Sequence, residues 1–317
     1  MLLTAGAVRA GRKPTAPMTS YLLLQAANGV VVGLIYALAA AGLTLIFSVL
    51  KIVNFGHGTL YMLGGYAAFY AIRLLGLPPA LAVVAAMIAL FLFGIAFERL
   101  FLTPLYTDKV ERKDEYAIIV TFGLFMLLEN AAIVVFGPFN RSAPSFLRGA
   151  VHLGVLAITY DRLIAAGAAI VLLVLLSLFM TRTMIGRVLD AVSQSREAAA
   201  IVGIDARRYY AVAFGIGAAL AGGAGALIGP IFTLTPTMGD LPSMKAFIII
   251  VLGGMGSVPG SIVGGVLIGL VEAIGVAIYP DADRALAYSS AFSALLLVFM
   301  LLFRPTGLFG RRHMRME

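Results

Sequence analysis

The 317-residue chain is 61% hydrophobic and only 12% charged, with a mean hydropathy of +1.02 and a formal net charge of +8. This composition excludes an ordinary soluble globular protein. Apolar runs near twenty residues predict membrane-spanning helices, and the alternating ten-residue segments of a β-barrel are absent. We therefore predict an all-α polytopic membrane protein whose basic residues set its topology rather than bind nucleic acid.

The two ends of the chain differ from its apolar body. In the first twenty residues, three basic side chains follow a short apolar patch, the reverse of the order in a secretory signal peptide. Residues 1–20 are therefore predicted to be a disordered extension, and the pattern leaves Met1 and Met18 open as alternative starts. We expect one transmembrane domain over 21–310 and a basic cytoplasmic tail over 311–317.

Nine apolar runs follow one another along this domain, separated by charged, proline or glycine breaks. They cover about 21–50, a second run to 72, 80–97, 116–136, 159–180, 209–231, a seventh run to 251, an eighth to 278, and 286–303. A helix of about twenty residues crosses a bilayer, and the longer first run suits a tilted helix. We expect eight or nine transmembrane helices.

The topology follows from Lys and Arg, which favour the cytoplasmic side. The charged connector at 107–115, the basic break at 181–208 and the tail are expected inside. Counting back from the tail leaves the N-terminus outside despite its basic residues. Two explanations remain open: either an early segment only dips into the membrane, or the extension overrides the charge rule.

Two glycine-rich stretches predict broken or re-entrant helices, because glycine permits unusual backbone conformations and close helix approach. Residues 28–66 weakly echo 212–265, which suggests an internal repeat of the kind found in transporters. A chance likeness between membrane helices is an equal alternative. Close packing is favoured over a ligand cradle for these positions, which are Gly56, Gly58, Gly64, Gly65, Gly253, Gly254, Gly256, Pro259 and Gly260.

The segment 181–208 is basic yet patterned, and it lies between two long apolar runs. An amphipathic helix is predicted because four apolar residues recur at helical spacing, namely Ile185, Val188, Leu189 and Val192. Ser195 is placed to cap a second short helix, with Glu197 in its first turn and Gly203 at its end. A structured cytoplasmic segment of this kind is typical of a docking surface, although a solvated loop is the plainer alternative.

Side chains that could carry chemistry are few. The chain has no phosphate-binding loop, and its three histidines lack metal-site spacing, so we expect no catalytic site and no metal. Polar residues inside apolar runs are costly and often line a translocation path. The candidates are Asn54, His57, Glu129, Asn130 and Glu272. A structural hydrogen-bonding role is the alternative for each, and we favour it for His57.

Four motifs occur in a recognisable order: NFGHGTLYMLGGY, TRTMIGRVLDAVSQSREAAAIVGI, FGIGAALAGGAGAL and VLGGMGSVPGS. Together they resemble the permease subunits of branched-chain amino acid ABC importers, in particular the high-affinity H-type, and the resemblance covers Asn28 to Gly310. It implies a multi-pass protein of the bacterial inner membrane. The implied partners are a second permease or another copy of this chain, two ATPase subunits that use the ATP, and a periplasmic or lipid-anchored solute-binding protein.

The resemblance also implies a role for the 181–208 segment. Glu197, Ala198, Ala199 and Gly203 are similar to the EAA-x3-G pattern with which importers couple to their ATPases. The later I-x-L-P part of that pattern is missing. The residues expected to couple are Arg187, Ser195, Arg196, Glu197, Ala198, Ala199 and Gly203, with Ala199 and Gly203 as small contact positions.

The expected substrates are leucine, isoleucine and valine, although related permeases serve urea, short amides, aromatic acids or other amino acids. The alternative from another class is a proton-coupled secondary transporter that uses Glu129 and His57. A membrane scaffold is a third alternative, disfavoured by the broken, glycine-rich spans. The 181–208 segment discriminates between the first two, because a secondary transporter needs no docking helix for an ATPase.

Overall fold

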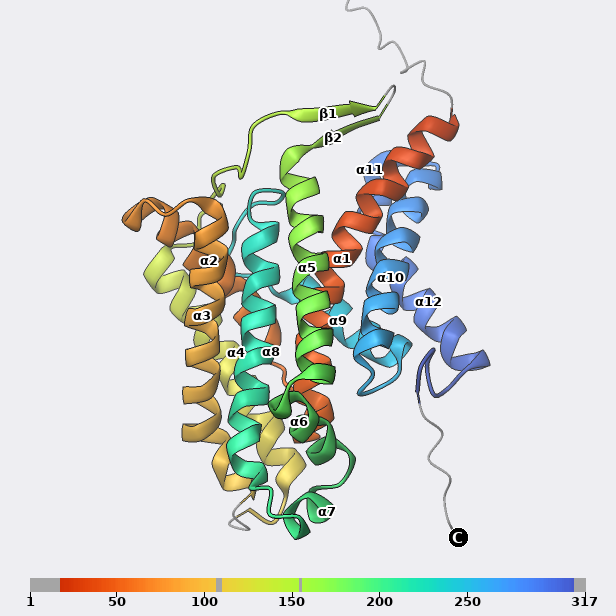
Figure 1. The fold of residues 1–317 in the computed structure, drawn as a ribbon. Helices are drawn as coiled ribbons and strands as arrows, with labels where there is room; N and C mark the ends of the chain where they lie inside the picture. Colours follow the sequence, from red (N-terminus) through yellow and green to blue (C-terminus); the bar gives the residue numbers. More distant parts are fainter. Residues whose placement is uncertain (1–17, 107–109, 154–155, 311–317) are drawn as a thin grey trace, which may run out of the picture.

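A computed structural model describes residues 18–106, 110–153 and 156–310, so most of the expected extension and the basic tail lie outside the described residues. The chain forms a bundle of long helices (Figure 1). In order, the elements are α1 (Met18–Leu50), α2 (His57–Leu75), α3 (Pro79–Phe97), α4 (Lys113–Phe136), β1 (Ala150–Leu153), β2 (Leu156–Thr159), α5 (Tyr160–Arg182), α6 (Met184–Gln194), α7 (Arg196–Ile201), α8 (Ala206–Ile228), α9 (Asp240–Gly253), α10 (Val258–Ile278), α11 (Ala282–Ala285) and α12 (Ser289–Phe303).

Six helices in the described part of the chain are long and apolar enough to cross a membrane: α1, α3 with its continuation, α4, α5, α8 and α10. The helix α12 is shorter, and α2 and α9 each follow a non-helical segment, residues 51–56 and 229–239. The predicted helical membrane fold is thus confirmed. The count of eight or nine crossings stays a prediction, because the broken segments prevent a count by helix length.

Two helix boundaries and one connection differ from those expected. The first helix begins at Met18, inside the predicted extension. The third span does not end at Glu98 but continues through a π-helical turn, Glu98–Leu102, and a 3₁₀ turn, Thr103–Tyr106. The alternation of apolar residues beyond Glu98 explains this, since Leu102 and Leu105 are buried. The outer connection contains an antiparallel hairpin, β1–β2, which a purely α prediction missed.

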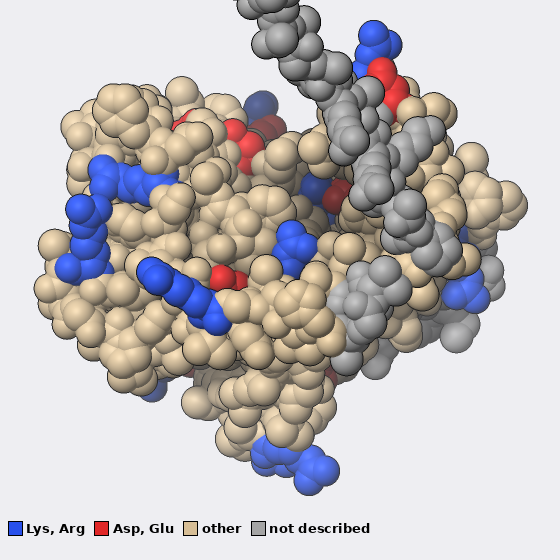
Figure 2. Space-filling view, turned by 90° about the horizontal axis from the view of Figure 1, so that it is seen from above, with Lys and Arg blue, Asp and Glu red and all other residues tan. Residues whose placement is uncertain are grey.

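The two ends of the bundle have different charges. The α6–α7 end carries most of the basic side chains of the described residues, whereas β1, β2 and the start of α1 lie at the opposite end (Figure 1). Seen from the hairpin end, the surface is mostly uncharged with separate basic side chains (Figure 2). The charge rule therefore places α6 and α7 in the cytoplasm and the start of α1 outside.

The helix trios α1–α3 and α8–α10 pack reciprocally. Helix α1 lies against α10, α3 lies against α8, and α1 and α8 cross each other. In each trio the middle helix follows a non-helical break. This exchange of the third helices is the arrangement that two related units of opposite orientation would produce, so the packing favours the predicted repeat over chance likeness.

Glycines set the distance between the crossing helices. A Cβ on Gly64 of α2 would overlap the backbone of Gly222 in α8, and one on Gly58 would overlap that of Gly239 ahead of α9. Between α1 and α8, a Cβ on Gly42 would lie 2.6 Å from the carbonyl oxygen of Gly217. The glycine stretches therefore act in close packing, as membrane helices often require.

Gly64→Ala should lower the thermal stability of the purified protein, because overpacking of a tight contact costs about 1–3 kcal/mol. Gly123→Ala is the matched control, since a Cβ at Gly123 of α4 meets nothing within 4 Å. Thermal unfolding in detergent, followed by size-exclusion chromatography, measures both. Equal melting temperatures for the two variants would contradict the close approach.

Candidate coupling segment and translocation path

The candidate coupling segment, called the coupling segment below, comprises α6, α7 and the turn that follows them. Thr183 begins α6, with its hydroxyl accepting a hydrogen bond from the Gly186 amide at 3.0 Å. Ser195 ends α6 and caps α7, because its hydroxyl accepts from the Ala198 amide at 3.1 Å. The predicted second helix and its Ser195 cap are thus present. Glu197 lies in the first turn of α7, where a negative charge favours the helix.

One face of α6 packs on the bundle through Val188, Leu189 and Val192, as predicted. Ile185 was predicted on the same face but is 43% exposed, and Gly186 is buried in its place. The close approach of Gly186 to the end of α5 explains the difference, since a side chain there would overlap Phe179 and Met180. The backbone of α6 thereby lies directly against the helix that precedes it.

The tip of the segment differs from the prediction in which side chains it presents. Ala199 is only 3% exposed and packs α7 onto the domain, so it is not available for contact as expected. Gly203 is exposed, has a φ of +81°, and has open space where a Cβ would be. The tip presents Ile201 and Val202, which are 86% and 72% exposed and which the sequence analysis missed.

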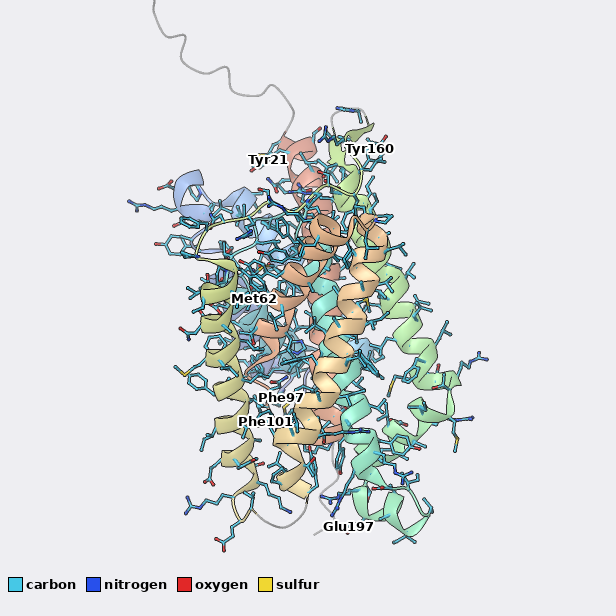
Figure 3. The ribbon with its side chains drawn as sticks, turned by 90° about the vertical axis from the view of Figure 1, so that its left-hand side faces the viewer. Tyr21, Met62, Phe97, Phe101, Tyr160 and Glu197 are labelled. Atoms are coloured by element: carbon cyan, nitrogen blue, oxygen red, sulfur yellow. The ribbon has the colours of Figure 1, made fainter. Side chains whose placement is uncertain are left out.

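Arg187, Arg196, Glu197 and Ala198 complete the predicted set, and all four are exposed. Glu197 lies at the α6–α7 end of the bundle, opposite the end that carries Tyr21 and Tyr160 (Figure 3). The exposed apolar pair together with these charged residues gives the segment a surface with both apolar and polar contacts. Such a surface is suited to a protein partner.

Arg196 anchors α7 to the rest of the bundle. Its guanidinium lies 5.8 Å from the Tyr106 ring and 5.9 Å from the Tyr210 ring, whose centroids are 4.3 Å apart. Arg196 and Arg207 also donate to the main-chain oxygen of Tyr106, at 3.4 and 3.3 Å. The coupling segment is therefore tied to the continuation of α3 and to α8. A cavity of about 290 Å³ lies between the coupling segment and the end of α1, so the two are not closely packed there.

The break before α2 is fixed by local hydrogen bonds. The Asn54 side chain accepts from the Gly56 amide at 3.1 Å, and His57 Nε2 lies 2.8 Å from the Ala39 carbonyl oxygen of α1. Both side chains are buried, at 0% and 1% exposure. Asn54 Nδ2 and His57 Nδ1 have no hydrogen-bond partner among the described residues. These contacts match the structural role favoured for His57.

Near this break, one face of the bundle exposes polar and aromatic groups together. Phe55 is 38% exposed, and its ring lies 5.7 Å from that of Phe247 in α9. Glu129 of α4 is partly exposed and close enough to Asp240, at the start of α9, for the two carboxyl groups to interact electrostatically. Asn130 points outward and donates to the Met126 carbonyl oxygen at 2.8 Å. Of the two broken helices, α9 thus begins at an exposed carboxylate.

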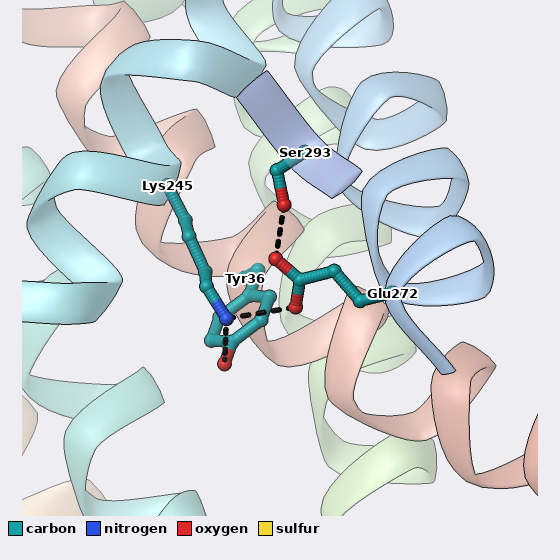
Figure 4. Close-up of polar contacts among 4 residues, drawn as sticks. All are labelled: Tyr36, Lys245, Glu272 and Ser293. Carbon is teal, nitrogen blue, oxygen red and sulfur yellow. Dashed lines mark hydrogen bonds and ion pairs between the residues drawn. The ribbon is translucent and has the colours of Figure 1, made fainter. Parts of the chain in front are cut away.

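Glu272 lies in a different environment from the other candidates. Its carboxylate pairs with Lys245 Nζ of α9 at 2.7 Å and accepts a hydrogen bond from Ser293 of α12 (Figure 4). Lys245 also donates to the Tyr36 hydroxyl of α1 at 3.2 Å. All but Tyr36 are at most 8% exposed. The structure therefore assigns Glu272 to an ion-pair network that joins four helices, and the sequence analysis missed its partner Lys245.

These features together define a class. A bundle of apolar helices, two helices that begin after non-helical breaks, and a short structured segment between two spans are typical of membrane transport permeases. A protein-family model, described as the permease component of the branched-chain amino acid transport system, matches residues 25–301 of this chain. The chain belongs to this family of branched-chain amino acid transport permeases.

Curated relatives resemble the chain over nearly its whole length. It is 33% identical to BraD, a high-affinity branched-chain amino acid transport system permease protein of Pseudomonas aeruginosa, with 93% of this chain and 98% of BraD covered. It is 31% identical to LivH of Escherichia coli K12, covering 92% and 96% of the two chains. LivM of the same bacterium is more distant, at 27% identity over 87% of this chain and 68% of LivM. The predicted resemblance to the H-type permease is thus confirmed.

Lys245→Met or Glu272→Met should destabilise the protein strongly, because removing one partner of a buried ion pair costs about 3–5 kcal/mol. The double variant Lys245→Met/Glu272→Met should recover much of that loss, since no buried charge is left unpaired. Thermal unfolding of the purified single and double variants provides the comparison. A double variant as unstable as the sum of the two single ones would show that the pair is not a coupled unit.

Proposed function

We propose that this chain is the H-type permease subunit of an ATP-binding-cassette importer in the bacterial inner membrane, which carries leucine, isoleucine and valine inward. The observation that carries the proposal is the coupling segment. It is a capped, anchored structure with an exposed apolar tip on the cytoplasmic side, and family membership supports the same role. A proton-coupled carrier has no use for such a tip, and His57 is held by the α1 backbone.

The proposed contact with the ATPase centres on Ile201, Val202, Glu197 and Ala198. The apolar pair is the part that a groove on a partner would bury, and burial of two such side chains contributes roughly 1.5–3 kcal/mol each. Ala199 and Ser195 act indirectly by holding the shape of α7, and Arg196 passes its movement to α3 and α8. The ATP itself is bound and hydrolysed by the partner subunits.

The proposed translocation path follows the face that carries Phe55, Glu129 and Asp240. Both broken helices begin there, so backbone groups free of helical pairing come close to a substrate's charged ends. Half of the path would come from a second permease. Escherichia coli K12 has both a LivH and a LivM permease protein related to this chain, which favours a homologue over a second copy.

The direct test is uptake of radiolabelled leucine into proteoliposomes. This chain, a second permease of the family, two ATPase subunits and a solute-binding protein should together give uptake that requires ATP and resists a proton uncoupler. This chain alone should give none. Uptake by this chain alone that is driven by a proton gradient would contradict the importer assignment and favour the secondary transporter.

Ile201→Asp/Val202→Asp should abolish co-purification of the ATPase while leaving the amount of folded permease unchanged, because both side chains are exposed. Leu286→Asp is the matched control, since Leu286 is 74% exposed at the opposite end of the bundle. Pull-down of the ATPase and substrate-stimulated ATP hydrolysis are the two readouts. Full activity of the double variant would mean that the tip is only a solvated turn.

Glu129→Gln should retain more uptake than Glu129→Leu at equal membrane abundance. The amide keeps a polar group of the same shape on the proposed path, whereas Leu replaces it with an apolar side chain. Initial uptake rates, normalised to the amount of permease in the membrane, make the comparison. The reverse order of the two variants would remove Glu129 from the path.

A further inference from the structure

An open groove of about 600 Å³ lies between α2, α3 and the end of α4, away from both the coupling segment and the proposed path. Its walls are almost wholly apolar or aromatic. They are formed mainly by Leu63, Tyr66, Tyr70, Leu74, Phe93 and Phe136. This volume is within the range of about 300–1,000 Å³ that ligand sites have.

The groove has the length of one leaflet. Along α2 it extends from Leu63 to Leu74, and eleven steps of about 1.5 Å give a length of roughly 16 Å. The hydrocarbon core of a bilayer is about 30 Å thick, so one leaflet supplies about half of that. Because Leu74 is one residue from the outer end of α2, the groove runs from the external surface to the middle of the membrane.

Two guanidinium groups lie beside the outer part of this groove, although neither lines it. The Arg73 and Arg141 guanidinium carbons are each 5.8 Å from the centre of the Phe69 ring, so they lie within twice that distance of each other. Arg141 is also 5.7 Å from the ring of Tyr70, which lines the groove. Figure 2 shows basic side chains at the edge of the outer face that overlies α2 and α3.

The charge of this pair is not neutralised within the described residues. Arg141 donates to the Phe136 carbonyl oxygen, but its buried Nε has no partner there, and neither guanidinium has a carboxylate within ion-pair distance. Two cations around one ring repel each other, and an anion between them would relieve this. An apolar groove below a cationic rim is complementary to one kind of molecule in a membrane.

We propose that this groove binds an anionic phospholipid of the outer leaflet, with an acyl chain along α2 and α3 and the phosphate group at Arg73 and Arg141. The site is separate from ATPase coupling, and it does not depend on the transported substrate. By filling the gap between α3 and α4, the lipid connects the end of α4 to α2 and α3 in the outer half of the membrane.

The chain contains no tryptophan, so Phe93→Trp gives a single fluorescent reporter in the wall of the groove. The full-length protein is reconstituted with brominated phosphatidylglycerol or brominated phosphatidylcholine at low mole fraction. Quenching by the anionic lipid should exceed that by the zwitterionic lipid several-fold. Val174→Trp is the control outside the groove, because Val174 is exposed and, like Phe93, lies 14 residues after the first residue of its helix, and it should show no preference.

Arg73→Gln and Arg73→Gln/Arg141→Gln should each reduce the preference at Phe93→Trp. Arg73 is exposed and has no hydrogen bond or ion pair with the described residues, so its single variant is expected to fold. Arg148→Gln removes the same charge from the same end and should have no effect. The proposal is overturned if the preference survives the double variant, if it is equal at Val174→Trp, or if neither lipid quenches because protein fills the groove.

Discussion

Close contact between helix backbones is the constraint on which this structure depends. Lipid tails are as apolar as the helices, so burial from water does not hold the helices together, and van der Waals contact at short range takes its place. Gly42 with Gly217, and Gly64 with Gly222, allow α1 and α2 to reach α8 at that range. These crossings bring the non-helical segments before α2 and α9 into the bundle, where Asn54 and Leu234 are fully buried.

The buried ion pair has a place in the same scheme. The helix α9 has fourteen residues and packs against α1, α2, α10 and α12. Lys245 and Glu272 hold it to α10, while Tyr36 and Ser293 extend the network to α1 and α12. At its inner end the chain segment after α12 pairs with it, because Leu308 and Phe309 donate to the carbonyl oxygens of Leu252 and Gly253. The helix α9 is therefore held both at the Lys245 network and at its inner end, and this fixes the face that carries Phe55 and Asp240.

Much of this architecture could be predicted because composition and periodicity report directly on membrane helices. The Ser195 cap and the buried Val188–Leu189–Val192 face followed from local chemistry alone. The sequence could not show that Ala199 faces inward while Ile201 and Val202 face outward, since a six-residue helix has too little periodicity to orient it. It also could not pair Lys245 with Glu272, because contact between different helices depends on their packing. The continuation past Glu98 was missed because a charged residue was taken as a membrane boundary.

The contacts of Arg196 and Arg207 with Tyr106, which anchor α7 to the bundle, are of two kinds that tolerate mutation differently. Arg196 and Arg207 both donate to the main-chain oxygen of residue 106, which any amino acid would provide. The ring stacked beside Tyr210 is a separate contribution, and only an aromatic side chain can supply it. A substitution of Tyr106 can therefore weaken the ring contact while both hydrogen bonds to the main-chain oxygen are retained. Relatives of this chain can therefore differ in how strongly α7 is held to α3 and α8 while the position of α7 stays the same.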